Sequence, residues 1–85
     1  MMLSTEFQNA QETVRHFAYR PSNERMLQLY SLYKQAAEGD VSGEGPSNMF
    51  DFVAKAKFNA WEGLKGTTKE VAIHKYIDLV ASLGK

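Results

Sequence analysis

The stretch LYSLYKQA at residues 29–36 has the pattern of the second half of an amphipathic α-helix, and the rest of the chain is interpreted from it. On such a helix Tyr30 and Lys34 are four residues apart and share a face, with Tyr33 on the flank of that face. Aromatic rings, phenol hydroxyls and an ammonium group this close together suit a planar polar ligand that carries a phosphate. The alternative is that both tyrosines are half-buried packing residues and that Lys34 merely extends to water.

The composition allows one domain with a modest core, because the chain has 85 residues. Ten acidic and ten basic side chains give a formal net charge of zero, so no overall field attracts nucleic acid or an anionic membrane. The absence of cysteine excludes disulfides and thiolate chemistry and fits a reducing compartment. The sequence has no recognisable secretory signal or membrane span. We therefore expect residues 1–85 to form one cytoplasmic domain.

Two helices are predicted for the first half of the chain. The helix that contains residues 29–36 runs over 23–38, with Ser22 as its N-cap and Gly39 at its end. An earlier helix runs over residues 4–18, capped by Ser4 or Thr5, and stops before Pro21 because proline disfavours helical geometry in the preceding residue. The apolar seam of this first helix consists of Leu3, Phe7, Ala10, Val14 and Phe17.

A long connection follows the second helix. Residues 39–48 are rich in glycine and small polar side chains and form a loop of about ten residues, longer than most connections in a compact domain. Fully extended, the loop spans up to about 35 Å, whereas a helix over 23–38 is only about 24 Å long. The next helix can therefore begin at the far end and run parallel to the second one.

Two further helices are predicted for the second half. The third begins at Asn48 or Asp51 and ends at Gly66 as a C′ glycine, and TTKE at residues 67–70 is a capping box that opens the fourth. The fourth helix turns inward Ala72 or Ile73, Tyr76, Ile77, Val80 and Leu83. Because no strand pattern is present, the predicted fold class is all-α, a four-helix bundle with a long loop between the second and third helices.

The chain has no recognisable catalytic or metal-binding motif. His16 and His74 each stand alone on a helix, at no metal-ligand spacing from another His, Asp or Glu. The serines form no nucleophile elbow and the glycines form no phosphate loop. We predict that the protein is not an enzyme, holds no metal and needs no cofactor.

Several motifs over essentially the whole chain resemble the acyl-CoA-binding protein family. They are residues 33–36 with Gly39-Asp40, the loop exit at 46–52, KAKFNAW at 55–61 and KGT at 65–67. The resemblance implies four helices in an up-down-down-up arrangement and noncovalent binding of a medium- to long-chain acyl-CoA. It implies an intracellular carrier, expected to be a monomer, with transient contacts to acyl-CoA-using enzymes or membranes and none to nucleic acid.

The resemblance also implies roles for eight residues. Tyr30, Tyr33 and Lys34 match positions on the second helix that contact the adenine and the ribose 3′-phosphate. Lys57 and Tyr76 match residues of the third and fourth helices that approach the same nucleotide. Further expected contacts are Arg15 near the coenzyme, and Met26 and Leu27 along the acyl groove.

The sequence departs from the family pattern at four places. Val53 stands where many members have a lysine, so one phosphate contact is expected to be missing. Gln11 replaces a small residue against the ligand, Phe58 replaces a tryptophan, and the loop exit at 46–49 is one residue longer than usual. The alternative function is a helical interaction module, or an accessory domain of a lipid-metabolising enzyme such as an enoyl-CoA isomerase. The joint presence of Lys34 and Lys57 favours ligand binding, because packing alone does not require two lysines there.

Overall fold

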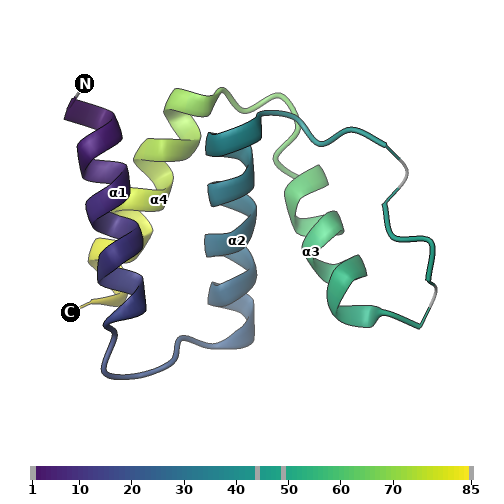
Figure 1. Ribbon diagram of the computed structural model, residues 1–85, viewed down its shortest axis with the longest axis horizontal. Coiled ribbons are helices and arrows are strands. Elements are labelled where there is room, and N and C mark those ends of the chain that lie inside the picture. Colours follow the sequence, from purple (N-terminus) through teal and green to yellow (C-terminus); the bar gives the residue numbers. More distant parts are fainter. Residues whose placement is uncertain (1, 44, 49, 85) are drawn as a thin grey trace.

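The computed structural model describes residues 2–43, 45–48 and 50–84; the side chains of residues 2–4, and so that of Leu3, lie outside this description, as does Met49. Four helices follow one another along the chain (Figure 1): α1 (Met2–Arg15), α2 (Asn23–Glu38), α3 (Phe52–Glu62) and α4 (Lys69–Leu83). In Figure 1, α2 runs opposite to α1, α3 runs parallel to α2, and α4 runs back again. This confirms the predicted all-α fold and its up-down-down-up order.

The helices form a flat assembly in which α2 is central. Its extents are 36 × 29 × 15 Å. α2 packs against both α4 and α3, and α4 also packs against α1. Among the helices of the described residues, α3 therefore packs only on α2, and no residue of α3 is buried. The surface between α2 and α3 is consequently less tightly closed than the core.

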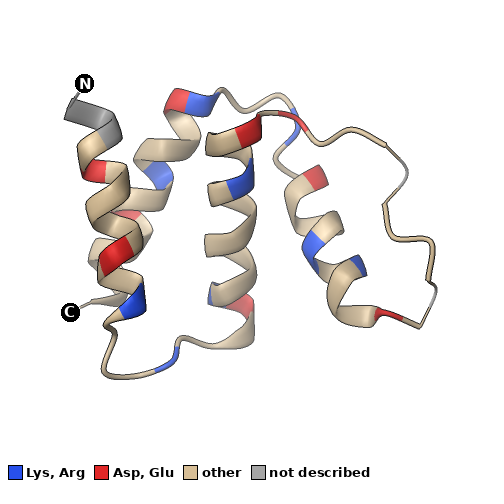
Figure 2. Cartoon of the chain, viewed as in Figure 1, with Lys and Arg blue, Asp and Glu red and all other residues tan. Residues whose placement is uncertain are grey.

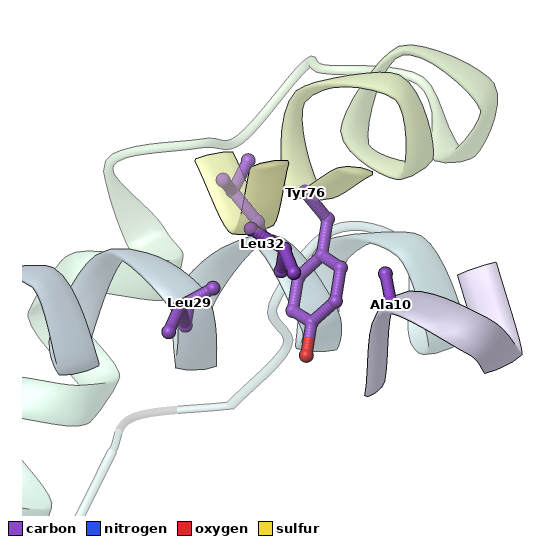
Figure 3. Close-up of a cluster of buried hydrophobic side chains, with 5 residues drawn as sticks. Ala10, Leu29, Leu32 and Tyr76 are labelled. Carbon is purple, nitrogen blue, oxygen red and sulfur yellow. The ribbon is translucent and has the colours of Figure 1, made fainter. Parts of the chain in front are cut away.

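The hydrophobic core lies between α1, α2 and α4. Figure 3 shows Tyr76 of α4 projecting between Leu32 of α2 and Ala10 of α1. The predicted seam of α1 packs against this cluster through partly buried Phe7, Val14 and Phe17. The buried members of the cluster are Ala10, Leu29, Leu32, Tyr76 and Val80. Burial of these apolar side chains is the main source of stability, at about 25 cal/mol per Å² removed from water.

Local capping signals fix the bounds of α2 and the start of α3. The Ser22 hydroxyl accepts a hydrogen bond from the amide of Arg25 at 3.2 Å, which confirms the predicted N-cap of α2. At the other end Gly39 has φ = +84°, a left-handed conformation that favours glycine. The Asp51 carboxylate accepts from the amide of Ala54 at 2.9 Å, so Asp51, and not Asn48, opens α3.

The predicted bounds of α1 were wrong at both ends. The helix begins at Met2, so Ser4 and Thr5 lie inside it and neither is its N-cap. It ends at Arg15, three residues before Ala18, because the amides of His16 and Phe17 bond to carbonyls three residues back, those of Thr13 and Val14. Such tight bonds end the regular helix and start the reversal toward α2.

The junction between α3 and α4 also differs from the prediction. α3 ends at Glu62, and residues 63–66 form a turn that closes at Gly66, where φ is +94°. Thr68, not Thr67, is the N-cap of α4, because its hydroxyl accepts from the amide of Val71 at 3.1 Å. Glu70 is therefore one residue too early to complete the predicted capping box.

A buried glutamine at the end of α2 explains that shift. Gln35 is fully buried, and its Nε2 donates to the Thr67 carbonyl at 2.6 Å and to Asp40 Oδ1 at 2.8 Å. Asp40 Oδ1 also accepts from the amide of Gly66 at 2.9 Å. These bonds hold Thr67 in the connection and leave the next residue to begin α4. We call Gln35, Asp40, Gly66 and Thr67 the Gln35 network.

The Gln35 network also changes the acidity of Asp40. Its backbone bond from Gly66, and then its bond from Gln35, lower the pKa of the Asp40 carboxyl below the ordinary value, because both donors stabilise the charged form. A nearby charge on Lys65 acts in the same direction. The network is therefore strongest when Asp40 is ionised.

Replacing Gln35 by Met should lower the free energy of unfolding by about 1–3 kcal/mol, because the Thr67 carbonyl loses its donor while side-chain length is kept. Urea unfolding followed by circular dichroism measures this change. The matched control is Gln8→Met on the exposed face of α1, which should change stability by less than about 0.5 kcal/mol. Equal effects of the two substitutions would contradict a stabilising role for the network.

Stability should depend on pH through Asp40. Because its pKa is lower in the folded chain, its contribution is present at neutral pH and is lost as pH falls below about 4. We expect Asp40→Asn to be less stable than the parent at pH 7, and the difference to shrink as pH approaches 3. Urea midpoints measured from pH 7 to pH 3 test this, with Asp78→Asn on the exposed side of α4 as the control. A difference that is constant with pH would exclude the assigned role.

Candidate ligand-binding site

A groove of about 550 Å³ lies between α2 and the first half of α3. Four of the predicted site residues line it: Met26, Leu27, Tyr30 and Lys57. The other lining residues are Arg20, Asn23, Phe52, Val53 and Ala56. The wall is thus mainly apolar, with two cations and no carboxylate, which suits a ligand with an apolar chain and an anionic group.

Most of the apolar wall of the groove lies outside the core, although Met26 also packs against the core cluster. Phe52 and Val53 at the start of α3 are 72% and 65% exposed. Met26 and Leu27 lie one helical turn before Tyr30 on the face of α2 that turns toward α3. Val53 was expected to matter only as a missing lysine, but it lines the groove itself.

Lys57 and Tyr30 meet across the groove. Lys57 Nζ lies 5.3 Å from the centroid of the Tyr30 ring, within the range of a cation–π contact. The two residues come from α3 and α2, so their contact joins the two sides. The structure thus brings together a phenol and an ammonium that are 27 positions apart in the sequence.

Lys34 is held one turn further along α2. Its ammonium group forms a hydrogen-bonded ion pair with the carboxylate of Glu38 and lies 5.0 Å from the centroid of the Trp61 ring. The bond to Glu38 raises the pKa of Lys34 above its ordinary value, and the nearby Tyr30 and Tyr33 add to this. Lys34 therefore stays cationic between α2 and α3, beside the two tyrosines with which the sequence associates it.

Tyr33 and Tyr76 form a second aromatic group around Phe7 of α1. The Phe7 ring stacks on Tyr33 at 6.0 Å between centroids and meets Tyr76 edge-on at 5.2 Å. Tyr76 is buried, which raises its pKa; Tyr33 raises it further and the charge of Arg15 lowers it. Arg15 is thus near enough to act on Tyr76, although it pairs with Glu12 at 3.2 Å and is largely exposed.

The site residues accordingly fall into two neighbouring sets. Met26, Leu27, Tyr30 and Lys57 line the groove, whereas Tyr33 and Tyr76 contact Phe7, and Arg15 is near enough to Tyr76 to lower its pKa. Lys34 is near enough to both Tyr30 and Tyr33 for them to raise its pKa, so it adjoins both sets. The tyrosine rings pack against neighbouring side chains, and Tyr30 also stands beside a cation, so their role in binding a ligand stays a prediction.

Sequence reasoning missed three side chains that matter for the groove. Arg20 lies in the loop between α1 and α2, where helical spacing gives no signal. Phe52 is the first residue of α3 and was assigned no role. Trp61, known from the sequence only as part of the motif at 55–61, lies beside Lys34, and its Nε1 donates to the Gly39 carbonyl at 2.9 Å.

Two of the departures from the family pattern lie outside the groove. The Gln11 amide donates to the Phe7 carbonyl at 3.3 Å, and Gln11 lines a shallow polar hollow on α1 instead. Phe58 packs on the loop at Gly45, where an added Cβ would come within 3.0 Å of its ring. Glycine is required there, since φ is also +81°.

Charges over the rest of the surface are mixed. Figure 2 shows basic and acidic residues interspersed over all four helices. An anion site in the described residues thus depends on individual cations such as Lys34 and Lys57. In the same residues, no three His, Cys, Asp or Glu side chains are grouped so as to hold a metal ion. No helix of the described chain combines the length and apolar character needed to cross a membrane.

Comparisons with known proteins agree with this geometry. The profile of the family described as "Acyl CoA binding protein" matches residues 4–80. Acyl-CoA-binding protein from Dictyostelium discoideum is 46% identical over 79 residues, which cover 93% of each chain. Enoyl-CoA delta isomerase 2 from Rattus norvegicus is 47% identical over 92% of this chain, which corresponds to only 20% of that enzyme. The crystal structure of Oryza sativa Acyl-CoA-Binding Protein 2 superposes with a TM-score of 0.89 at 37% identity, covering 95% of this chain and 89% of that one.

Proposed function

Because the chain belongs to the acyl-CoA-binding protein family, we propose that it binds medium- to long-chain acyl-CoA thioesters noncovalently and acts as their buffer and carrier in the cytoplasm. The observation that carries this proposal is that Lys34 and Lys57, from two different helices, both lie near Tyr30, with Lys57 over its ring. A phosphate dianion between two ammonium groups makes charge-assisted hydrogen bonds with both.

The nucleotide end of the ligand is assigned to the polar half of the site. Tyr30 and Tyr33 offer ring surfaces to the adenine, while Lys34 and Lys57 bind the ribose 3′-phosphate. Tyr76 and Arg15 lie on the α1 and α4 side of the same region and complete the contacts to the coenzyme. The interaction of Lys34 with both tyrosines supports this assignment.

The acyl chain is assigned to the groove between α2 and α3. Met26, Leu27, Phe52 and Val53 provide its apolar wall. Each methylene group taken out of water adds about 0.8 kcal/mol, so affinity should rise with chain length until the groove is full. No covalent step is required, and we propose a binding protein, monomeric and not an enzyme, in which residues 1–85 form one binding domain.

The similarity to a segment of enoyl-CoA delta isomerase 2 supports a second candidate function, that of an accessory or interaction module. In that enzyme the matching segment is one fifth of the length. A related domain can therefore serve as an accessory module of a lipid-metabolising enzyme. An interaction module without ligand would leave the pair of lysines unexplained, so the carrier function has the better support.

Calorimetric titration with palmitoyl-CoA, coenzyme A alone and free palmitate tests the proposal. We expect tight binding of the thioester, far weaker binding of coenzyme A and negligible binding of palmitate, because the groove and the nucleotide contacts act on one molecule. If no acyl-CoA of any chain length binds, the protein is an interaction module and the carrier function is wrong.

Lys34→Ala and Lys57→Ala should each weaken palmitoyl-CoA binding by about 1.5–3 kcal/mol, roughly 10- to 150-fold, because each removes a charge-assisted bond to phosphate. Calorimetry measures the affinity, and thermal unfolding checks that the fold is kept. Lys75→Ala, on the exposed side of α4, is the control for the loss of a charge and should bind like the parent. Parent-like binding by either site variant would remove that lysine from the phosphate site.

Leu27→Ala should weaken palmitoyl-CoA binding by about 1–2 kcal/mol and leave the binding of coenzyme A alone unchanged, because Leu27 lines only the apolar wall. The same titrations measure both affinities. Val71→Ala, an exposed apolar residue on α4, is the matched control. An equal loss for coenzyme A would show that Leu27 acts on the nucleotide end instead.

A further inference from the structure

The direct bonding partner of Lys34 in the structure is a carboxylate of the protein itself. Glu38 lies four residues further along α2, and its side chain forms the hydrogen-bonded ion pair with the Lys34 ammonium. The Lys34 side chain is 24% exposed and the Glu38 side chain is 52% exposed. Lys34 is thus largely covered and has one anionic partner, which itself stands at the surface.

The position of Glu38 is unfavourable for the helix that carries it. Glu38 is the last residue of α2, where the helix dipole places partial negative charge. The other acidic residue near an end of α2 is Glu24, in the first turn, where the dipole favours it. Because Glu38 is also half exposed, core packing gives no reason for a carboxylate there. The interaction that the structure does show for Glu38 is its ion pair with Lys34.

Lys57, the second lysine of the proposed site, is held differently. Its ammonium lies over the Tyr30 ring, and in the described residues it forms no ion pair with a carboxylate. An aromatic face holds a cation in place without satisfying its capacity to donate hydrogen bonds to an anion. Of the two lysines, only Lys34 must therefore give up an anionic partner when it binds another anion.

We propose that Glu38 is an affinity- and specificity-determining residue: its carboxylate competes with the 3′-phosphate of the ligand for Lys34. This inference rests on the proposed function and deepens it. Binding is then an exchange, in which the Lys34–Glu38 pair opens and a Lys34–phosphate pair forms. The displaced carboxylate remains one helical turn from the dianion and repels it, so Glu38 lowers the affinity for ligands that carry this phosphate.

The effect is specific for the phosphate. A ligand without the 3′-phosphate keeps its diphosphate but lacks the group that the proposal assigns to Lys34, so the pair with Glu38 stays closed and the carboxylate does not compete with that ligand. Glu38 thus reduces the difference in affinity between a 3′-phosphorylated ligand and a dephosphorylated one. Because two partly exposed charges are involved, the competition is weakened by salt.

Calorimetric titration of the parent, Glu38→Gln, Lys34→Ala and the double variant tests the proposal, with palmitoyl-CoA and palmitoyl-3′-dephospho-CoA as probes. We expect Glu38→Gln to bind palmitoyl-CoA roughly threefold to tenfold more tightly than the parent at low salt, and less so at high salt. Its affinity for the dephosphorylated probe should equal that of the parent. In the Lys34→Ala background, Glu38→Gln should give a clearly smaller gain in affinity, because only the direct repulsion between the carboxylate and the phosphate is then removed. Asp78→Asn controls for the change in net charge and should bind like the parent.

Other results would overturn the proposal. Unchanged or weaker binding of palmitoyl-CoA by Glu38→Gln would mean that Glu38 orients Lys34 instead of competing for it. If Glu38→Gln increased the affinity for palmitoyl-CoA as much in the Lys34→Ala background as in the parent, the effect of Glu38 would be direct repulsion alone and not competition for Lys34. If the parent binds and only the Glu38 comparison fails, the carrier function stands without this inference. If neither the parent nor Glu38→Gln binds either probe, both are wrong.

Discussion

The hydrogen bonds of one buried amide hold together the part of the molecule on which the site depends. Gln35 joins the end of α2 to Asp40 and to Thr67, and Asp40 in turn holds Gly66. Because α3 packs on α2 alone among the helices of the described chain, its position is not fixed by a core on its other side. The Gln35 network anchors the connection that leaves α3, and the Trp61 bond to the Gly39 carbonyl anchors α3 itself. The distance of Lys57 from Tyr30 therefore depends in part on bonds at the C-terminal end of α3, which begin one turn beyond Lys57.

The arrangement of α2 explains why one helix serves both packing and binding. Leu29, Leu32 and Ala36 are buried, and the core members of this set face α4 and α1. Tyr30 faces α3 and lines the groove instead. Since α2 has neighbours on two sides, its broad apolar stripe is divided between a closed core and an open groove. A ligand site made this way needs no strained backbone, because among the described residues positive φ angles occur only at glycines.

Much of the fold could be predicted from the sequence, and the failures at the junction of α3 and α4 and in the groove have a common cause. The bounds of α2 were predicted correctly because Ser22 and Gly39 act on residues within one turn of themselves. The end of α3 and the cap of α4 were not, because Thr67 is held by Gln35, 32 positions earlier in the chain. The same distinction between local and long-range contacts applies to the residues of the groove. Tyr30 and Lys57 were identified through the family resemblance, whereas Arg20 and Phe52 belong to the site only because of the path of the chain. Local spacing carries no information about such contacts.

Zero net charge and the proposed capture of a dianion are compatible because the cations near the site are supported in different ways. Lys34 pairs with Glu38, and Arg15 pairs with Glu12, so these two cations are neutralised locally. Each pair keeps a long side chain in a restricted position, which reduces the conformational entropy that ordering it on a ligand would otherwise cost. The same pairing opposes binding, because the carboxylate must be displaced. A cation held on an aromatic ring, as Lys57 is on Tyr30, also has a restricted position. It has no carboxylate that the ligand must displace. In a site that has both kinds of lysine, the affinity for the anion depends on how many lysines are paired with a carboxylate and how many lie on an aromatic ring. Substituting a carboxylate beside a lysine, such as Glu38 beside Lys34, therefore changes this affinity without altering the groove.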